Sequence, residues 1–338
     1  MEEINKRIGV AVVGLGVGEQ HARRYANINS CQLKLLYDLD EKKSSNLARA
    51  LKSEIAINYE QILQDSGIDV ISIASFDDAH YEQVVSGLKS GKHLFVEKPL
   101  CNTIDELTEI KVLWSKNKGS LKLSTNHILR AAPLYRWLKE QITSGEFGEI
   151  YAFDGDYLYG RLQKITNGWR GSAKNYSGMK GGGVHLIDLM IWLTAQRPLS
   201  VSTIGNNICT KHMNFEHYDF MSSSFYFNSG LMGRITANLG CVHRHQHCLR
   251  IFGTKKTFIF DDMGPRVHHT RDPHNRASPI LIDTLPKNKA DLIPFFISSV
   301  LEDQNLNEHT QSLFDVISVC TACDRALQLK SEVIIDYV

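Results

Sequence analysis

The chain has 338 residues, of which 43% are hydrophobic and 22% are charged, with 38 basic side chains against 37 acidic ones. A chain of this length usually forms two domains and can bury a large core without disulfide bonds. The formal net charge of +1 gives no sign of the basic surface that nucleic-acid binding requires, so we expect no nucleic-acid partner.

The chain opens on the polar stretch MEEINKR, and no apolar run approaches the roughly 20 residues that a membrane span needs. We therefore expect neither a signal peptide nor contact with a membrane. The seven cysteines are odd in number and form no CxxC pair, which is more typical of reduced thiols than of a disulfide framework. These features predict a cytoplasmic protein.

Short β-branched runs alternate with longer amphipathic stretches over the first third of the chain. Near-continuous apolar runs separated by helical stretches are typical of parallel strands that are covered on both faces. Residues 1–125 therefore predict a doubly wound, nucleotide-binding α/β domain. The expected strands are Ile8–Gly14, Leu33–Asp38, Val70–Ser75, His93–Pro99 and Leu121–Thr125.

The pattern changes after residue 125, and residues 126–338 predict a second, α+β domain. The strand-like runs Tyr218–Phe227 and Leu231–Leu239 are separated by a turn of Asn, Ser and Gly, which indicates a hairpin. A second hairpin is expected within Leu249–Asp262 and a helix over Gln311–Leu329. Antiparallel pairing of this kind predicts a sheet that is open on one face.

The strands of this sheet carry large apolar side chains that few following helices could cover. An exposed apolar face is unusual for a monomer, and stacking two copies about a twofold axis would bury both faces. The sequence thus predicts a homodimer, or a homotetramer built from such dimers. The side chains assigned to this face are Phe220, Phe225, Phe227, Met232 and Ile235.

A glycine cluster, VVGLGVGEQHA, leaves the first expected strand and enters a helix. Gly14 would allow a tight turn, and Gly16 would let the backbone approach a pyrophosphate at the helix N-terminus. The usual third glycine would fall on Glu19, whereas this chain has Gly18. A plain strand-to-helix turn also uses glycine, but the place of this one at the start of a βαβ alternation favours dinucleotide binding.

Asp38 ends the second expected strand, 22 residues after Gly16. A carboxylate at this position can bind the 2′-hydroxyl of an adenosine ribose and would repel a 2′-phosphate. Leu39 follows it, with no adjacent arginine. We therefore expect NAD as the cofactor, with NADP less favoured.

Lys98 lies in the segment Val-Glu-Lys-Pro at the end of another expected strand. The carboxyl ends of parallel strands open onto the ligand crevice, which places Lys98 where a nicotinamide ring and a substrate would meet. A surface lysine on a strand-to-helix loop is the alternative.

Two further stretches are candidates for substrate binding. Asn126 and Arg130 follow the last parallel strand, although polar residues at such a junction often only hydrogen-bond the backbone. Trp169 and Arg170 form an aromatic and cationic loop, which would suit a sugar ring or a phosphate as well as plain surface packing.

His243, His245 and His247 alternate along an expected strand and would project from one face. In a strand they would spread over about 13 Å, too far to meet at one zinc ion with bonds of about 2 Å unless the strand bends. We therefore expect no metal and assign the three histidines to a polar sheet face at a subunit contact.

Several segments, in order over nearly the whole chain, resemble the Gfo/Idh/MocA oxidoreductase family. The glutamate-lysine-proline segment together with a downstream glycine-histidine-aspartate helix is specific as a combination. The resemblance implies a Rossmann domain joined to a mixed α/β domain with a large open sheet, and hydride transfer between NAD(P) and a sugar, cyclitol or sugar-nucleotide carbon. The segments are the glycine turn with His21, Ser75–Leu100, Ile142–Phe153, Gly181–Leu193 and Leu249–Asp262.

The resemblance implies that Lys98 is the active-site lysine and that His185 is the acid–base histidine, which also contacts the substrate. Oxidising a C–H–OH carbon requires a base for the hydroxyl proton and a cation or donor beside the oxygen. Asp188, three residues after His185, could orient the imidazole or could instead pair with the backbone or an arginine. Cofactor contacts are expected at Gly14, Gly16, Gly18, His21, Asp38, Ser75, His80, Glu97 and Lys98.

One position departs from the family pattern. Many members have an aspartate or asparagine four residues before the helix histidine, where this chain has Gly181. The lysine–histidine pair could suffice, activity could be reduced, or the preceding loop could fill the gap with Tyr176, Lys174 or Lys180.

These features together predict an NAD-dependent oxidoreductase with a small, sugar-type substrate. A nucleotide-sensing regulator of the same fold is one alternative, and Gly181 is the residue that favours it. A dihydrodiol dehydrogenase or an imine reductase is another, since it would use the same cofactor site with a more apolar substrate pocket.

Overall fold

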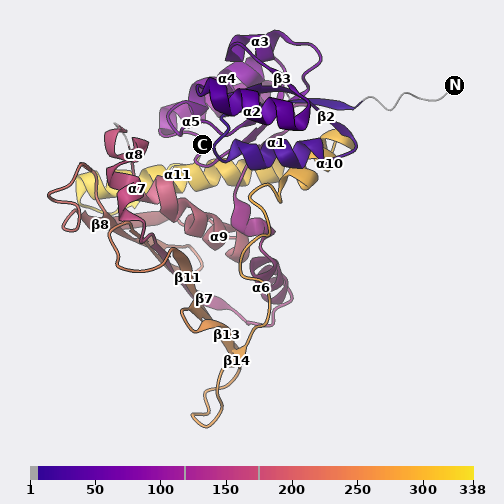
Figure 1. Cartoon of the computed structure of the whole chain (residues 1–338). Coiled ribbons are helices and arrows are strands. Elements are labelled where there is room, and N and C mark those ends of the chain that lie inside the picture. Colours follow the sequence, from indigo (N-terminus) through magenta and orange to yellow (C-terminus); the bar gives the residue numbers. More distant parts are fainter. Residues whose placement is uncertain (1–6, 118, 174–175) are drawn as a thin grey trace. The chain divides into compact units, whose positions relative to one another are not determined.

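The computed structural model describes residues 7–117, 119–173 and 176–338 (Figure 1). The chain forms two compact units, each drawn from two stretches of sequence. Unit 1 consists of Met1–Ile128 and Pro286–Phe314, and unit 2 of Leu129–Leu285 and Asp315–Val338. The division into a dinucleotide-binding domain over 1–125 and a substrate-binding and oligomerisation domain over 126–338 stays a prediction.

Unit 1 is built on a six-stranded parallel sheet with the order β3-β2-β1-β4-β5-β6, which confirms the predicted Rossmann fold. Every residue of β1 and β4 is buried, as expected for apolar strands covered on both faces. The strand order reverses between β1 and β4, the point at which such sheets bind ligands. The strands are β1 (Ile8–Val13), β2 (Cys31–Tyr37), β3 (Glu54–Ile55), β4 (Val70–Ile73), β5 (His93–Val96) and β6 (Leu123–Thr125). The helices are α1 (Gly18–Ala26), α2 (Glu41–Leu51), α3 (Tyr59–Gln64), α4 (His80–Lys89), α5 (Ile104–Lys116) and α10 (Ile293–Leu301).

Unit 2 contains a nine-stranded sheet with the order β14-β13-β12-β11-β7-β10-β9-β8-β15. Strands β7 and β10 pair in parallel and the other neighbours pair antiparallel, so the predicted large, mostly antiparallel sheet is confirmed. The strands are β7 (Ile150–Leu158), β8 (Ser200–Asn206), β9 (Phe220–Tyr226), β10 (Met232–Asn238), β11 (Gln246–Gly253), β12 (Thr257–Asp261), β13 (Gly264–His268), β14 (Ser278–Pro279) and β15 (Val333–Ile334). The helices are α6 (Pro133–Thr143), α7 (Leu162–Thr166), α8 (Trp169–Ser172) and α9 (Val184–Thr194), with a π-helical turn over Met179–Gly183. Helix α11 (Asn307–Leu329) begins in unit 1 and ends in unit 2.

One face of the nine-stranded sheet is covered by the chain's own helices. Phe225, Phe227 and Ile235 are buried in one cluster with side chains of α9 and of the unit 2 part of α11. Their assignment to an exposed dimer face is therefore wrong, because α9 and α11 supply the cover that the sequence pattern did not reveal. Phe220 and Met232 are less buried and belong to the opposite face, since side chains alternate along a strand.

The other face of this sheet carries a cluster of two aspartates and two arginines on β7, β10 and β11. The Arg250 guanidinium lies 2.6 Å from Asp154 and 3.0 Å from Asp156. Arg234 also forms ion pairs with both carboxylates. We call Asp154, Asp156, Arg234 and Arg250 the aspartate–arginine cluster. The two carboxylates and two guanidinium groups balance, so the cluster carries no net charge.

No helix within the described residues combines the length and the apolar character needed to cross a lipid bilayer.

A buried polar network lies at the carboxyl ends of β5 and β6 in unit 1. The Glu97 carboxylate accepts a hydrogen bond from Asn126 Nδ2 at 2.6 Å and lies 3.2 Å from His21 Nε2. His21 is fully buried, and its Nδ1 lies 3.0 Å from Ser72 Oγ. Burial alone would raise the pKa of the Glu97 carboxyl, but the hydrogen bonds from His21 and Asn126 and the charge of Lys98 lower it to about 2. The folded protein therefore stabilises the charged carboxylate.

We expect Glu97→Gln to lower the free energy of unfolding at neutral pH by on the order of 1–3 kcal/mol, because the amide lacks the charge that the network stabilises. The pKa of Glu97 is lower in the folded protein than in the unfolded chain. Its contribution is therefore complete above about pH 4.5 and is lost as the pH falls through about 2.

Urea unfolding at several pH values, from about 2 through about 4.5 to neutrality, measures this contribution. The difference between the wild-type protein and Glu97→Gln should shrink as the pH falls. Glu216→Gln, at an exposed carboxyl in unit 2, is the control and should change little. Parallel pH dependences for the wild-type protein and Glu97→Gln would contradict the prediction.

Candidate functional site

The glycine turn of unit 1 has the geometry that dinucleotide binding requires. Gly14 has a φ of +79°, and a Cβ there would lie 2.5 Å from the backbone of Ala74. A Cβ at Gly16 would meet no atom within 4 Å, so the space beside it is open. At Gly18, a Cβ would lie 3.1 Å from a Val12 methyl group, which is the close helix–strand packing expected of the third glycine in this motif.

Asp38 lies directly after β2, and the glycine turn holds its carboxylate in place. Oδ2 accepts a hydrogen bond from the Leu15 N–H at 2.5 Å, and Oδ1 accepts one from the Asp40 N–H at 2.8 Å. Each oxygen keeps a further lone pair, so the carboxylate can still accept a hydrogen bond from a ribose hydroxyl. The side chain of the adjacent Leu39 is 80% exposed.

His80 connects the segments that follow β4 and β5. Its ring is buried, with Nδ1 at 2.7 Å from the Pro99 carbonyl and Nε2 at 3.2 Å from the Ser75 carbonyl. Ser75 Oγ donates to Gln83 Oε1 at 2.6 Å. His80 and Ser75 therefore hold the loop in which Lys98 lies, two residues beyond the end of β5. Cofactor contacts by these residues stay predictions.

Asn126 is buried, and its amide is used within unit 1. Besides its bond to Glu97, Nδ2 donates to the Lys289 carbonyl at 2.8 Å. This arrangement corresponds to the backbone-bonded alternative that the sequence analysis described for a junction residue. Contact between Asn126 and a substrate stays a prediction.

Arg130 and Asp188, which were predicted separately, form an ion pair in unit 2. Arg130 donates from Nε and from a terminal nitrogen to the Asp188 carboxylate at 2.6–3.1 Å. Asp188 is 1% exposed. Asp188 thus pairs with an arginine, which was one of the alternatives given for it. The pair is part of the packing of α9. A buried pair of this kind is costly to break, because one charge would be left without compensation.

The glycine run before α9 lets large side chains lie against the helix. A Cβ at Gly181 would overlap the Tyr176 hydroxyl, and one at Gly182 would overlap the Tyr157 ring. A Cβ at Gly183 would lie 2.6 Å from the sulfur of Met179. A side chain at any of the three positions would therefore require the neighbouring residue to shift.

The structure distinguishes between the loop residues proposed to fill the gap at Gly181. Lys180 pairs with Asp324 at 2.8 Å. Lys174 lies outside the described residues. Tyr176 places its hydroxyl where a side chain at position 181 would begin.

Trp169 and Arg170 belong to the same aromatic group as Tyr176. The Arg170 guanidinium lies 4.7 Å from the centre of the Trp169 ring, a cation–π distance. Trp169 and Tyr176 meet edge to face at 6.3 Å between ring centres, and Phe215 lies 5.8 Å from Tyr176. Trp169 and Arg170 lie in the short helix α8 and not in the predicted loop, so that part of the prediction is wrong. Substrate binding by these two residues stays a prediction.

The histidines of the predicted alternating strand occupy different positions from those expected. Strand β11 begins at Gln246, so His243 and His245 precede it and the predicted alternation is wrong for both. His243 lies near the surface, 3.0 Å from Asp262, and its pKa is raised by hydrogen bonds to the Arg244 carbonyl and to Asp262. The described residues contain no group of histidine, cysteine, aspartate or glutamate side chains placed to hold a metal ion.

His247 instead lies against His185, and His245 lies against His247, a relation that the sequence pattern did not reveal. The ring centres of His185 and His247 are 5.3 Å apart, and those of His245 and His247 are 5.1 Å apart. The sequence carried no signal for this relation, because it depends on the register of β7 and β11, in which Tyr157 pairs with His247. That pairing joins strands far apart in the sequence.

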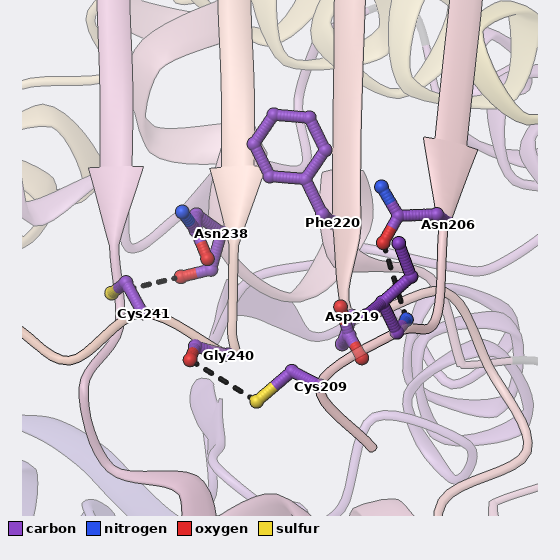
Figure 2. A pocket seen from close by; sticks show the side chains of 8 residues that line it. Asn206, Cys209, Asp219, Phe220, Asn238, Gly240 and Cys241 are labelled. Carbon is purple, nitrogen blue, oxygen red and sulfur yellow. Dashed lines mark hydrogen bonds between the residues drawn. The ribbon is translucent and has the colours of Figure 1, made fainter. Parts of the chain in front are cut away.

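A cavity of about 400 Å³ lies elsewhere in unit 2, at the ends of β8 and β10 and the start of β9 (Figure 2). Figure 2 shows the Cys209 thiol directed at the Gly240 carbonyl, to which it donates at 3.2 Å. None of the predicted site residues is among its lining residues. This cavity is therefore distinct from the surroundings of His185.

Both units match one protein family. Residues 8–125 match the family model described as "Oxidoreductase family, NAD-binding Rossmann fold", and residues 135–259 match that of the "GFO/IDH/MocA C-terminal domain". An inositol 2-dehydrogenase from Rubrobacter xylanophilus is 24% identical over 256 residues, which cover 75% of this chain and 71% of that protein.

Solved structures share the fold over almost the entire chain. The crystal structure of myo-inositol 2-dehydrogenase from Lactobacillus plantarum has a TM-score of 0.83 at 20% identity and covers 98% of this chain and 100% of its own. Levoglucosan dehydrogenase, in complex with NADH and levoglucosan, has a TM-score of 0.85 at 19% identity and covers 97% of this chain and 99% of its own. Since family models match the sequence in both units, the chain belongs to the Gfo/Idh/MocA family of oxidoreductases.

Proposed function

We propose that the protein is an NAD-dependent oxidoreductase that transfers a hydride between nicotinamide and a hydroxyl or keto carbon of a sugar, cyclitol or sugar nucleotide. The observation that carries the proposal is the open space beside Gly16 next to the fixed Asp38 carboxylate, which suits a dinucleotide. The related dehydrogenases named for inositol and levoglucosan support a small polyhydroxylated substrate. All seven cysteines are free thiols, which supports a cytoplasmic location.

In this proposal, Lys98 and His185 have different roles at the reacting carbon. The bound nicotinamide would supply the hydride acceptor. His185 takes the proton of the substrate hydroxyl, because a neutral imidazole accepts protons near neutral pH. Lys98 donates a hydrogen bond to the same oxygen and stabilises the negative charge that develops there. In the direction of reduction, His185 returns the proton to the oxygen.

We expect Lys98→Ala and His185→Ala each to lower kcat by about 10²-fold or more, the contribution typical of general acid–base groups, while NAD affinity is nearly unchanged. NADH absorbance, followed with a panel of sugars, cyclitols and sugar nucleotides, measures the rates, and calorimetry measures NAD binding. Lys116→Ala, at an exposed lysine of unit 1, is the control. Wild-type rates in the His185 variant would overturn its role, and NAD binding without turnover on the whole panel would favour the regulator.

We expect NAD to bind more tightly than NADP by on the order of 1–3 kcal/mol, because Asp38 would bind the ribose 2′-hydroxyl and repel a 2′-phosphate. Asp38→Asn keeps an acceptor for the Leu15 N–H and removes the charge, so it should reduce this preference more cleanly than Asp38→Ala. Calorimetry with both cofactors measures the two affinities. Equal affinities in the wild-type protein would contradict the assignment.

The Tyr176 hydroxyl, in this proposal, takes the place of the side chain that position 181 lacks. We expect Tyr176→Phe to lower kcat, and Gly181→Asp to lower both kcat and stability, because the new side chain would overlap the tyrosine. The double variant Tyr176→Ala with Gly181→Asp removes the overlap and should turn over faster than either Tyr176→Ala or Gly181→Asp. Steady-state kinetics and thermal melting measure these effects. Additive losses of kcat in the double variant would contradict the proposal that Tyr176 replaces the side chain missing at position 181.

We also propose a homodimer or homotetramer that forms through the exposed face of the nine-stranded sheet. Ile204, Tyr226 and Met232 lie on this face with the aspartate–arginine cluster and are 73%, 40% and 53% exposed. Light scattering should give at least twice the chain mass of 38.2 kDa, and Met232→Lys should lower it. Leu281→Lys, at an exposed position outside this face, is the control. A wild-type mass of one chain at micromolar protein would defeat the proposal.

A further inference from the structure

Five aromatic rings, including that of His185, pack in one cluster formed by β7, β11, α9 and the residues directly after β7 and before β11. We call Tyr157, Tyr159, His185, His245 and His247 the ring cluster. Tyr157 and Tyr159 stack with an angle of 9° and 5.8 Å between ring centres. His245 meets both tyrosines edge to face at 5.2–5.3 Å. All five belong to unit 2, so their contacts are internal to that unit.

The imidazole of His185 has two of these rings as neighbours in different directions. Tyr157 lies close to parallel with it, at 30° and 6.3 Å between ring centres. His247 meets it at 88° and 5.3 Å. A ring flanked by one nearly parallel neighbour and one perpendicular neighbour loses freedom to rotate about its bond to Cβ, because rotation would bring its edge into one of them.

The backbone places both of these neighbours. Tyr157 and His247 are direct partners in the β7–β11 register, so their positions are coupled by the sheet. Gly182 leaves room for the Tyr157 ring against the π-helical turn that precedes α9. The sheet and the helix therefore set the position of these rings relative to His185, which is the second residue of α9.

His247 acts on His185 as an uncharged ring. It is 9% exposed, and burial together with the nearby His245 lowers its pKa to about 3. Its Nε2 has no hydrogen-bond partner among the described residues. His247 therefore contacts His185 through ring packing.

We propose that His247 is a positioning residue, which holds the imidazole of His185 in the one orientation that presents its accepting nitrogen to the substrate. This inference rests on the proposed function, in which His185 exchanges the proton of the reacting hydroxyl. A displacement of about 1 Å at a catalytic group can cost about 10²-fold in rate, so a side chain that never touches the substrate can still control turnover. Substrate binding depends less on the orientation of the imidazole than turnover does.

Three substitutions at position 247 separate ring packing from other effects. We expect His247→Ala to lower kcat by about 10-fold or more with KM changed by less than about 3-fold, because His185 gains freedom to rotate. His247→Phe keeps a flat, neutral ring and should restore kcat to within about 3-fold of the wild-type value. His247→Leu fills the space without a flat ring and should remain slower than the Phe variant, which keeps the test valid if the Ala variant does not fold. His269→Ala, at an exposed loop histidine, is the control.

The outcomes distinguish this inference from the proposed function. A kcat for His247→Ala within about 2-fold of wild type, or a Phe variant as slow as the Ala and Leu variants, would overturn the positioning role even if His185→Ala is inactive. Wild-type rates in His185→Ala would instead overturn the proposed function itself. Loss of kcat in Ala and Leu, with recovery in Phe and unchanged NAD binding, is the result that supports positioning.

Discussion

Three consecutive positions without a side chain shape the turn that leads into His185. At Gly181 and Gly182 a Cβ would overlap Tyr176 and Tyr157, and at Gly183 it would lie 2.6 Å from the Met179 sulfur. The interior of a protein is densely packed, so alanine at position 181 or 182 would displace a tyrosine ring, and alanine at position 183 would displace the Met179 side chain. The π-helical turn and the rings that lie against it form one packed arrangement, and His185 extends from its end.

Each unit has buried charged groups close in sequence to one of the candidate catalytic residues. In unit 2 the Arg130–Asp188 pair lies one helical turn from His185. In unit 1 the Glu97 carboxylate is held by His21 and Asn126, directly before Lys98. Removing one partner of such a group leaves the other buried without compensation. These residues therefore stabilise the backbone that carries Lys98 and His185, whether or not they also contact a ligand.

The two faces of the nine-stranded sheet serve different purposes. The face that carries Phe225 and Ile235 is part of the core of unit 2, covered by α9 and α11. The opposite face balances two carboxylates against two guanidinium groups and exposes Tyr226 and Met232 beside them. A face that combines a charge-balanced polar cluster with exposed apolar side chains is compatible with water and with a second copy of itself, which is the basis for the proposed assembly.

Local pattern was enough to identify the Rossmann unit, the glycine turn, Asp38, Lys98 and the helix that carries His185. Apolar runs, glycine spacing and the ends of strands depend on neighbours in the chain, and the sequence displays those neighbours directly. The tertiary structure decided which face of the large sheet is covered, that Asp188 pairs with Arg130, and that Tyr176 lies at Gly181 while Lys180 pairs with Asp324. It also brought His247 to His185 by pairing β7 with β11. Each of these contacts joins residues that are distant in sequence or set by side-chain packing, so it exists only once the chain has folded.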